Sequence, residues 1–271
     1  PGRGSWLDFE FDPKDILFFR IDRKKKLPIT TFLLALGYNK NKIIETFYSK
    51  NIYSYNTETK SWITDFNVEN YKRPLKLSYD LINAKNNKKI LGKGEKLNLV
   101  IAKKLQEKGL DSILLSNEQI IGKYIGNDIK DKNGELIIGA GFDITEEQLE
   151  KIIVQGEKKI SIVNVDPINK GPYILETLKI DKNTDKIEAL NDIYKVLRPG
   201  EAPSSEIAED LFKNLYFSKE RYDLSEVGRV KLNSKLNLNI SDKKTILETA
   251  DIIAIIQFML NLRDGKGDVD D

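Results

Sequence analysis

The sequence predicts an α+β protein in which a mostly helical domain carries a β-hairpin and is interrupted by a second, compact α+β domain. Three observations predict this. A hairpin pattern opens the chain, the composition changes near Tyr48, and helical patterns prevail again from Gly171. We therefore expect a discontinuous domain, residues 1–47 and 171–271, and an inserted domain, residues 48–170, whose two ends lie close together.

The hairpin is predicted by two short strand-like runs. Aromatic and acidic residues alternate over Trp6–Asp12, Asp12–Asp15 is a polar turn that contains Pro13, and Ile16–Ile21 is apolar. Two such runs joined by an Asp-Pro turn are typical of a β-hairpin.

Two short helices are expected directly after the hairpin. An apolar run over Ile29–Leu36 follows Pro28, which suits a helix start, and Gly37 ends it. Asn39 is placed to cap a second helix. The apolar residues of that helix fall on one face: Ile43, Ile44 and Phe47.

The inserted domain alternates short strands with amphipathic helices. Its expected elements are a strand at Ser61–Phe66, a helix at Leu97–Lys108, a strand at Asp111–Leu115, a hairpin of Tyr124–Ile129 and Glu135–Ile138, a helix at Glu146–Gln155 and a strand at Lys159–Val163. Thr145 and Gln148 have the spacing of a capping box for the second of these helices.

Helices dominate the last hundred residues. One is predicted from Asp185 to Leu197, and the sequence Arg198-Pro199-Gly200 ends it. The next begins at Ser204 or Ser205, and a shorter one runs from Asp223 or Ser225 toward Lys231. The last, Asp251–Arg263, is apolar around most of its circumference, so we expect it to be buried on most sides.

The composition narrows the possible functions. The chain has 271 residues, is 40% hydrophobic and has a net charge of +2, so any nucleic-acid surface has to be a local basic patch. The absence of Cys excludes disulfides, and the absence of His removes the usual general base and zinc ligand. No apolar run has the roughly 20 residues of a membrane span. The sequence starts at Pro1 inside a motif and its only Met is Met259, so we expect a fragment of a larger cytoplasmic protein.

An aromatic residue and a basic run suggest nucleic-acid binding. Trp6 opens the hairpin, and the basic residues at its end are Arg20, Arg23, Lys24, Lys25 and Lys26, against a single acid, Asp22. Such an aromatic side chain stacks on a base, and the cations neutralise phosphates. The alternative is a buried core tryptophan beside a solvated run of charges.

Two groups of acidic residues are candidates for a catalytic or a metal site. Paired acids in the hairpin (Asp8, Glu10, Asp12 and Asp15) would suit a hydrolase, but their alternation is ordinary strand patterning. The acids at the end of the chain (Asp264, Asp268, Asp270 and Asp271) do not fit a calcium loop, because Lys266 and Val269 occupy its third and sixth positions. We expect a solvated acidic tail, and we predict no catalytic residue and no metal ligand.

Three segments resemble one known family. They are GRGSWLDFEFDPKDILFFRIDRKKKLP at residues 2–28, the stretch from GPYILETLKIDKNTDKIEALNDIYKVLRPGEAPSS onward at residues 171–233, and NLRDGKGDVDD at residues 261–271. The amino-acid sequences of these segments and their order along the chain resemble the lobe domain of the β subunit of bacterial RNA polymerase. The resemblance covers about 150 residues and implies that residues 48–170 are a lineage-specific insertion in the lobe.

The resemblance also implies a site. The lobe forms one wall of the downstream DNA channel in this family. Trp6, Asp22 and Arg198 match residues of a pocket that faces the unpaired non-template strand and favours guanine. The alternative for Asp22 and Arg198 is a structural ion pair that holds the hairpin to the helix at 185–197.

The resemblance implies partners and an activity for the whole enzyme. The partners are DNA, the β′, α and omega subunits, and sigma factor, with transcription regulators docking at the insertion; no membrane is involved. The whole enzyme is a nucleotidyltransferase whose magnesium is bound by the β′ subunit, so no cofactor is expected in this chain. We expect it to be cytoplasmic and associated with the nucleoid. A free-standing acid/base enzyme built on the Asp/Glu hairpin is the alternative function.

Overall fold

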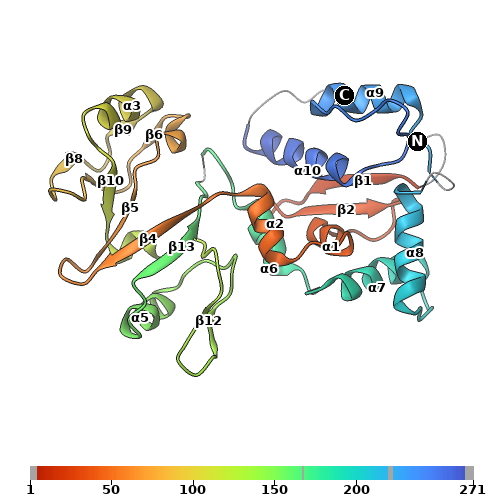
Figure 1. Cartoon of the computed structure of the whole chain (residues 1–271), viewed down its shortest axis with the longest axis horizontal. Helices are drawn as coiled ribbons and strands as arrows, with labels where there is room; N and C mark the ends of the chain where they lie inside the picture. The colour runs from red at the N-terminus through yellow and green to blue at the C-terminus, as the bar shows by residue number, and fades with distance from the viewer. Residues whose placement is uncertain (1–4, 167, 219–221, 266–271) are drawn as a thin grey trace. The chain divides into compact units, whose positions relative to one another are not determined.

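The computed structural model describes residues 5–166, 168–218 and 222–265. It confirms the α+β class, since helices occur beside several small antiparallel sheets (Figure 1). The chain divides into two compact units. The discontinuous unit comprises residues 1–43 and 176–271, and the middle unit comprises residues 44–175. Whether the middle unit is an insertion with the boundaries 48 and 170 stays a prediction. None of the helices among the described residues is both long and apolar enough to cross a membrane.

The discontinuous unit is built from one sheet and several helices. Its elements are β1 (Leu7–Phe11), β2 (Leu17–Ile21), β3 (Leu27–Pro28), α1 (Ile29–Ala35), α7 (Lys186–Leu197), α8 (Ser205–Tyr216), α9 (Glu226–Leu236) and α10 (Thr249–Arg263). Two further helices, α2 (Lys40–Phe47) and α6 (Tyr173–Ile180), contain the points at which the chain passes between the units.

The predicted hairpin is confirmed. β1 and β2 pair antiparallel with Phe9 opposite Phe19, and β3 adds a third short strand to the β2 edge. The turn is held by Asp12, whose carboxylate accepts the backbone N–H groups of Lys14 and Ile16 at 2.9 Å. This is the turn chemistry by which Asp closes short loops.

The first helix is the centre of this unit's core. Every residue of α1 is buried, and the ring of Phe32 meets Phe19 at 5.2 Å and Phe212 at 5.1 Å, both edge to face. Edge-to-face aromatic pairs add about 0.5–1.5 kcal/mol beyond the area they bury. The hairpin, α1 and α8 are thereby packed as one body.

The later helices begin where capping residues predict. Asp185, Ser204 and Ser225 each accept a backbone N–H of the first turn of α7, α8 and α9. Helix α9 is longer than expected. It continues past Lys231 to Leu236, and its C-cap, Asn237, has left-handed backbone angles.

Helix α10 is less covered than its composition suggests. Its fully buried apolar residues form one stripe, Ile252, Ile256 and Leu260, while its other apolar side chains are half-buried. A stripe spaced by four residues is what one neighbouring layer covers.

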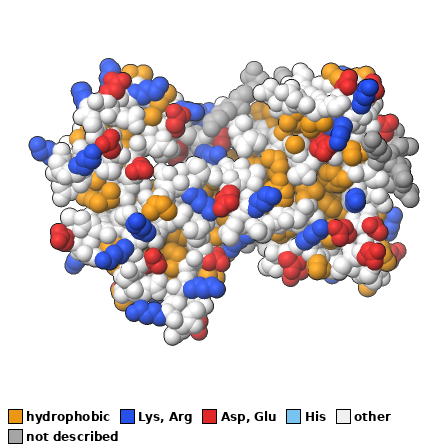
Figure 2. Space-filling model, in the orientation of Figure 1, with side chains coloured by type: hydrophobic (Ala, Val, Ile, Leu, Met, Phe, Trp, Pro, Cys, Tyr) orange, Lys and Arg blue, Asp and Glu red, His pale blue; other side chains and the backbone are white. Residues whose placement is uncertain are grey.

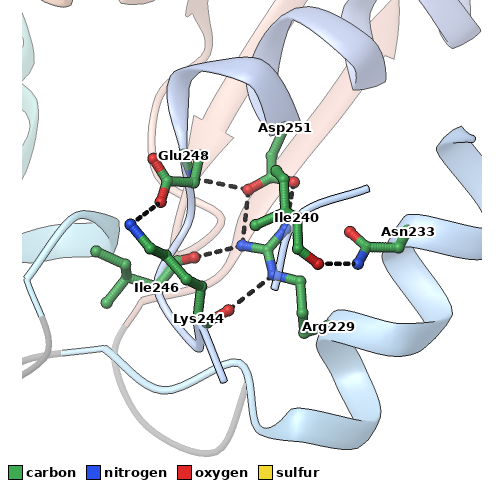
Figure 3. A network of polar contacts seen from close by, with 7 residues as sticks. All are labelled: Arg229, Asn233, Ile240, Lys244, Ile246, Glu248 and Asp251. Carbon is green, nitrogen blue, oxygen red and sulfur yellow. Dashed lines mark hydrogen bonds and ion pairs between the residues drawn. The ribbon is translucent and has the colours of Figure 1, made fainter. Parts of the chain in front are cut away.

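A buried ion pair joins α9 to α10 (Figure 3). Arg229 and Asp251 have fully buried side chains and are joined by two hydrogen bonds of 2.5 and 2.8 Å. Arg229 also donates to the carbonyl groups of Lys244 and Ile246, and Asp251 accepts the N–H of Glu248. Every nitrogen of the guanidinium therefore has an acceptor, which a buried charge requires.

The middle unit is organised around a four-stranded antiparallel sheet with the order β10-β5-β4-β13. Its elements are β4 (Lys50–Asn56), β5 (Ser61–Asp65), η1 (Val68–Tyr71), β6 (Leu75–Lys76), β7 (Leu81–Ile82), β8 (Lys89–Leu91), β9 (Lys96–Leu97), α3 (Leu99–Glu107), β10 (Ser112–Leu115), α4 (Asn117–Ile120), β11 (Ile129–Lys130), β12 (Leu136–Ile138), α5 (Glu146–Val154) and β13 (Lys159–Val163). The other strands and the helices expected here are present with shifted ends, and the Thr145–Gln148 capping box is formed. The hairpin is only the short pair β11–β12, so the strand expected over Tyr124–Ile129 is wrong except at Ile129; Tyr124 and Ile125 instead form isolated bridges to Asp143 and Ile162.

Two separate cores stabilise the middle unit. One surrounds Trp62, which is fully buried and donates its indole N–H to Asn117 at 2.8 Å. The other gathers Phe66, Leu81, Leu97, Ala102 and Leu110 beneath α3. We call residues 68–110, which contain all of this second core except Phe66, the lysine-rich module.

Candidate nucleic-acid interface

Trp6 has an exposed side chain on a fixed backbone. Its side chain is 63% exposed, so the alternative of a buried core tryptophan is wrong for this residue. Its backbone N–H donates to the Asp22 carboxylate at 2.8 Å, and its carbonyl accepts the Asp22 N–H at 3.0 Å and the Tyr216 hydroxyl at 3.1 Å. An exposed indole on a fixed backbone is able to stack on a base.

The turn after β2 places Asp22 in this position. Asp22 and Arg23 both have left-handed backbone angles, with φ of 51° and 59°, and the N–H of Lys24 donates to the carbonyl of Ile21 at 3.0 Å. Two consecutive left-handed residues define a type I′ turn, which favours Gly and disfavours Arg. The bond from Asp22 to Trp6 offsets part of this strain, and Arg23 is thereby turned outward and exposed.

The basic run divides into two groups. Arg23, Lys24 and Lys25 are exposed. Arg20 instead pairs with Glu10 at 2.7 Å and donates to the carbonyl of Lys24 at 3.0 Å, so it braces the loop from within. The assignment of all four cations to DNA binding stays a prediction.

Arg198 follows directly on the residue of α7 that the basic loop contacts. It is exposed at the end of α7, and Lys24 donates to the carbonyl of Leu197, the preceding residue, at 3.3 Å. Within the described part of the chain, Asp22 and Arg198 form no ion pair, so the structural alternative for these two residues is wrong. The Lys24 side chain makes one hydrogen bond to the end of α7, and the Asp22 carboxylate accepts the N–H of Trp6.

Tyr216 belongs to this site and was not predicted. It is fully buried and packs edge to face on Tyr222 at 5.5 Å. Burial, followed by the nearby carboxylate of Asp22, raises the pKa of Tyr216, so its hydroxyl stays protonated and donates to Trp6. The two residues are 210 positions apart, and the only local signal is the aromatic spacing Phe212, Tyr216.

The hairpin acids are used structurally. Glu10 pairs with Arg20, Asp12 closes the turn, and Asp15 accepts the side chain of Arg263 from α10. The described residues contain no group of three or more metal-ligating side chains. These contacts give the acid/base enzyme no support.

The acids at the end of the chain are only partly described. Asp264 is buried at the end of α10. The expectation that it belongs to a solvated acidic tail is therefore wrong for this residue. Asp268, Asp270 and Asp271 lie outside the described residues, as do Gly2–Gly4 of the first matching segment.

A sequence comparison decides the family. The family described as "RNA polymerase Rpb2, domain 2" matches residues 1–129 and 164–271, which is most of the chain. The chain belongs to the β-subunit family of bacterial RNA polymerases. Members of this family named "DNA-directed RNA polymerase subunit beta" match it over its whole length: 48% identity for Ehrlichia canis (strain Jake), 44% for Rickettsia massiliae (strain Mtu5) and 42% for Caulobacter sp. (strain K31).

The chain corresponds to only part of these relatives. The chain spans about a fifth of the length of these relatives, 19–20% in each. The family match includes most of the middle unit and leaves out residues 130–163, which contain β12, α5 and β13.

Proposed function

We propose that this chain forms the lobe of the β subunit in a bacterial DNA-directed RNA polymerase, one wall of the channel that holds downstream DNA. The chain contributes grip and strand placement. Transfer of nucleotidyl groups is the work of the whole enzyme, with DNA, the β′, α and omega subunits and sigma factor as partners. The magnesium for that chemistry would be bound by β′, and the enzyme acts in the cytoplasm on nucleoid DNA.

Within this role, the Trp6 indole stacks on an unpaired base of the non-template strand. Asp22 and Arg198 line the same pocket, and Arg23, Lys24 and Lys25 neutralise phosphates. The observation that carries this proposal is the 63% exposure of an indole whose backbone is held by three hydrogen bonds. A carboxylate beside the stacked base accepts from the N–H groups of guanine, which thymine does not present in the same arrangement.

The middle unit has a different role in the proposal. It is a lineage-specific insertion, residues 48–170, and offers a docking surface for transcription regulators. Its separate sheet and its two cores support an element that folds around its own apolar residues.

The test uses polymerase reconstituted with full-length β carrying Trp6→Ala, with Trp6→Phe as the control that keeps a stacking ring. A Trp–base stack contributes about 1–3 kcal/mol. We expect the open-complex lifetime to fall by about one to two decades at most for Trp6→Ala and less for Trp6→Phe. Nucleotide addition on a preassembled scaffold is expected to stay at the wild-type rate. An unchanged lifetime with Trp6→Ala would contradict the stacking role.

A further inference from the structure

The lysine-rich module carries a concentrated positive charge. Residues 68–110 contain ten Lys, one Arg and four acidic residues, a net charge of +7, in a chain whose total is +2. Several Lys and Arg side chains gather over this module in the upper left of Figure 2, where Figure 1 shows α3, β6 and β9. The rest of the chain is therefore net acidic, and the charge is a property of this one module.

Most of these lysines are available to a ligand. All ten are exposed; Lys72 pairs with Glu69 and Lys85 with Asp111. The remaining eight have no ion-pair partner among the described residues: Lys76, Lys88, Lys89, Lys93, Lys96, Lys103, Lys104 and Lys108.

Four of the eight lie together around the strand pair β6–β9. Lys76 and Lys96 are directly opposite each other in its register. Lys89 folds against the adjoining loop, because a Cβ at Gly92 would lie 3.2 Å from its Nζ. Lys93 is in that same loop. Like charges directly opposite on two strands repel one another, so an anion that bridges them relieves a cost built into the module.

The two nearby acids reduce the charge of this cluster but leave it positive, four Lys against Asp80 and Glu95. Asp80 accepts the backbone N–H of Lys93 at 2.7 Å, and Glu95 accepts that of Gly92. Both carboxylates therefore order the loop that carries Lys93. Helix α3 and its C-cap add three more exposed lysines: Lys103, Lys104 and Lys108.

We propose that the lysine-rich module is a second nucleic-acid-binding surface, which contacts the phosphate backbone without reading sequence. Lysine is a point charge suited to phosphate, whereas base reading uses the bidentate fork of Arg, and this segment has a single Arg. A protein partner fits less well, because Lys is depleted at protein interfaces. The surface is independent of the Trp6 pocket and of its proposed role.

The test measures binding of the 271-residue chain to a fluorescent 30-base-pair duplex of arbitrary sequence. The first variant is Lys76→Gln, Lys89→Gln, Lys93→Gln and Lys96→Gln together. The control removes the same charge from four exposed lysines of the other core: Lys130, Lys132, Lys158 and Lys159, each to Gln. Both sets are made in a background with Arg23, Lys24 and Lys25 changed to Gln. DNA binding by the hairpin cations is then removed from both measurements, so the result does not depend on the proposed function of the hairpin.

We expect the first variant to bind at least tenfold more weakly at 0.1 M salt and the control to change less than twofold. Each lost phosphate contact lowers the slope of log K against log salt by about 0.9, so the slope should fall by about 3 to 4 in the first variant. The four Lys→Arg changes should retain binding, and far-ultraviolet circular dichroism checks folding. Equal losses in variant and control, an unchanged salt slope, or polyglutamate binding as tightly as DNA would each overturn the proposal.

Discussion

Asp22 and Trp6 fix each other's position at the start of the hairpin. The Asp22 carboxylate accepts the N–H of Trp6 at 2.8 Å, and the Asp22 N–H donates to the carbonyl of Trp6 at 3.0 Å. This exchange extends the β1–β2 ladder by one pair, with a side-chain oxygen taking the place of a backbone carbonyl. The left-handed backbone at Asp22 makes the exchange necessary. Asp22 thus fixes the backbone of Trp6 and, in the proposed function, also lies beside the base on which Trp6 stacks.

Asp22→Asn separates these two roles. Asn tolerates left-handed angles, and its amide oxygen still accepts the N–H of Trp6, so the fold should be kept while the negative charge is lost. We expect reconstituted polymerase with this change to lose part of its preference for guanine over thymine at the downstream non-template position. Open-complex lifetime and pausing on the two templates measure it. Discrimination equal to wild type would show that the carboxylate has only a structural role.

Tyr216→Phe removes the hydroxyl that holds the Trp6 carbonyl. A buried hydrogen bond contributes about 0.5–1.5 kcal/mol, so we expect urea unfolding to show a loss of that size. Amide hydrogen exchange at Trp6 and Asp22 should become faster. The matched control is Tyr222→Phe, because the Tyr222 hydroxyl has no hydrogen bond to a described residue. If both variants have the same exchange rates at Trp6, Tyr216 is not a positioning residue.

Arg229→Met leaves Asp251 buried without its cation. Breaking a buried pair by removing one partner costs about 3–5 kcal/mol. The double variant Arg229→Met with Asp251→Leu should recover part of that loss, since no lone charge remains, but the carbonyl groups of Lys244 and Ile246 stay unpaired. Urea unfolding measures the stability of both variants, and we expect the double variant to lie between the single variant and wild type. A single variant as stable as wild type would mean that the pair is dispensable.

Excision of the middle unit should leave a folded remainder. Lys50 and Val163 face each other across β4 and β13, and the N–H of Asn164 donates to the carbonyl of Ser49 at 2.9 Å. The chain therefore enters and leaves at one place, and a Gly-Ser-Gly linker is long enough to replace residues 50–163. We expect one cooperative thermal transition from the shortened chain. Loss of that transition would show that the middle unit is required for the core of the remainder.

Local sequence determined the elements of this protein. Alternation marked β1, and an apolar run marked β2. Pro28 and Asn39 marked two helix starts, and the Thr145–Gln148 spacing marked a capping box; each reflects interactions within a few residues. The amino-acid sequences of three segments also indicated the family that the comparisons confirm. These features need no knowledge of what lies across the fold.

Tertiary structure alone decided which residues meet. Sequence did not distinguish the exposed Trp6 from the buried Trp62, since burial depends on what packs over each ring. It left an ion pair of Asp22 with Arg198 open as an alternative, whereas in the structure the Asp22 carboxylate accepts a backbone N–H. It also missed Tyr216 and the pair of Arg229 with Asp251, because no local period links residues brought together by helix packing. Proximity across the chain follows from the way the core closes, and a single sequence carries little direct signal for it.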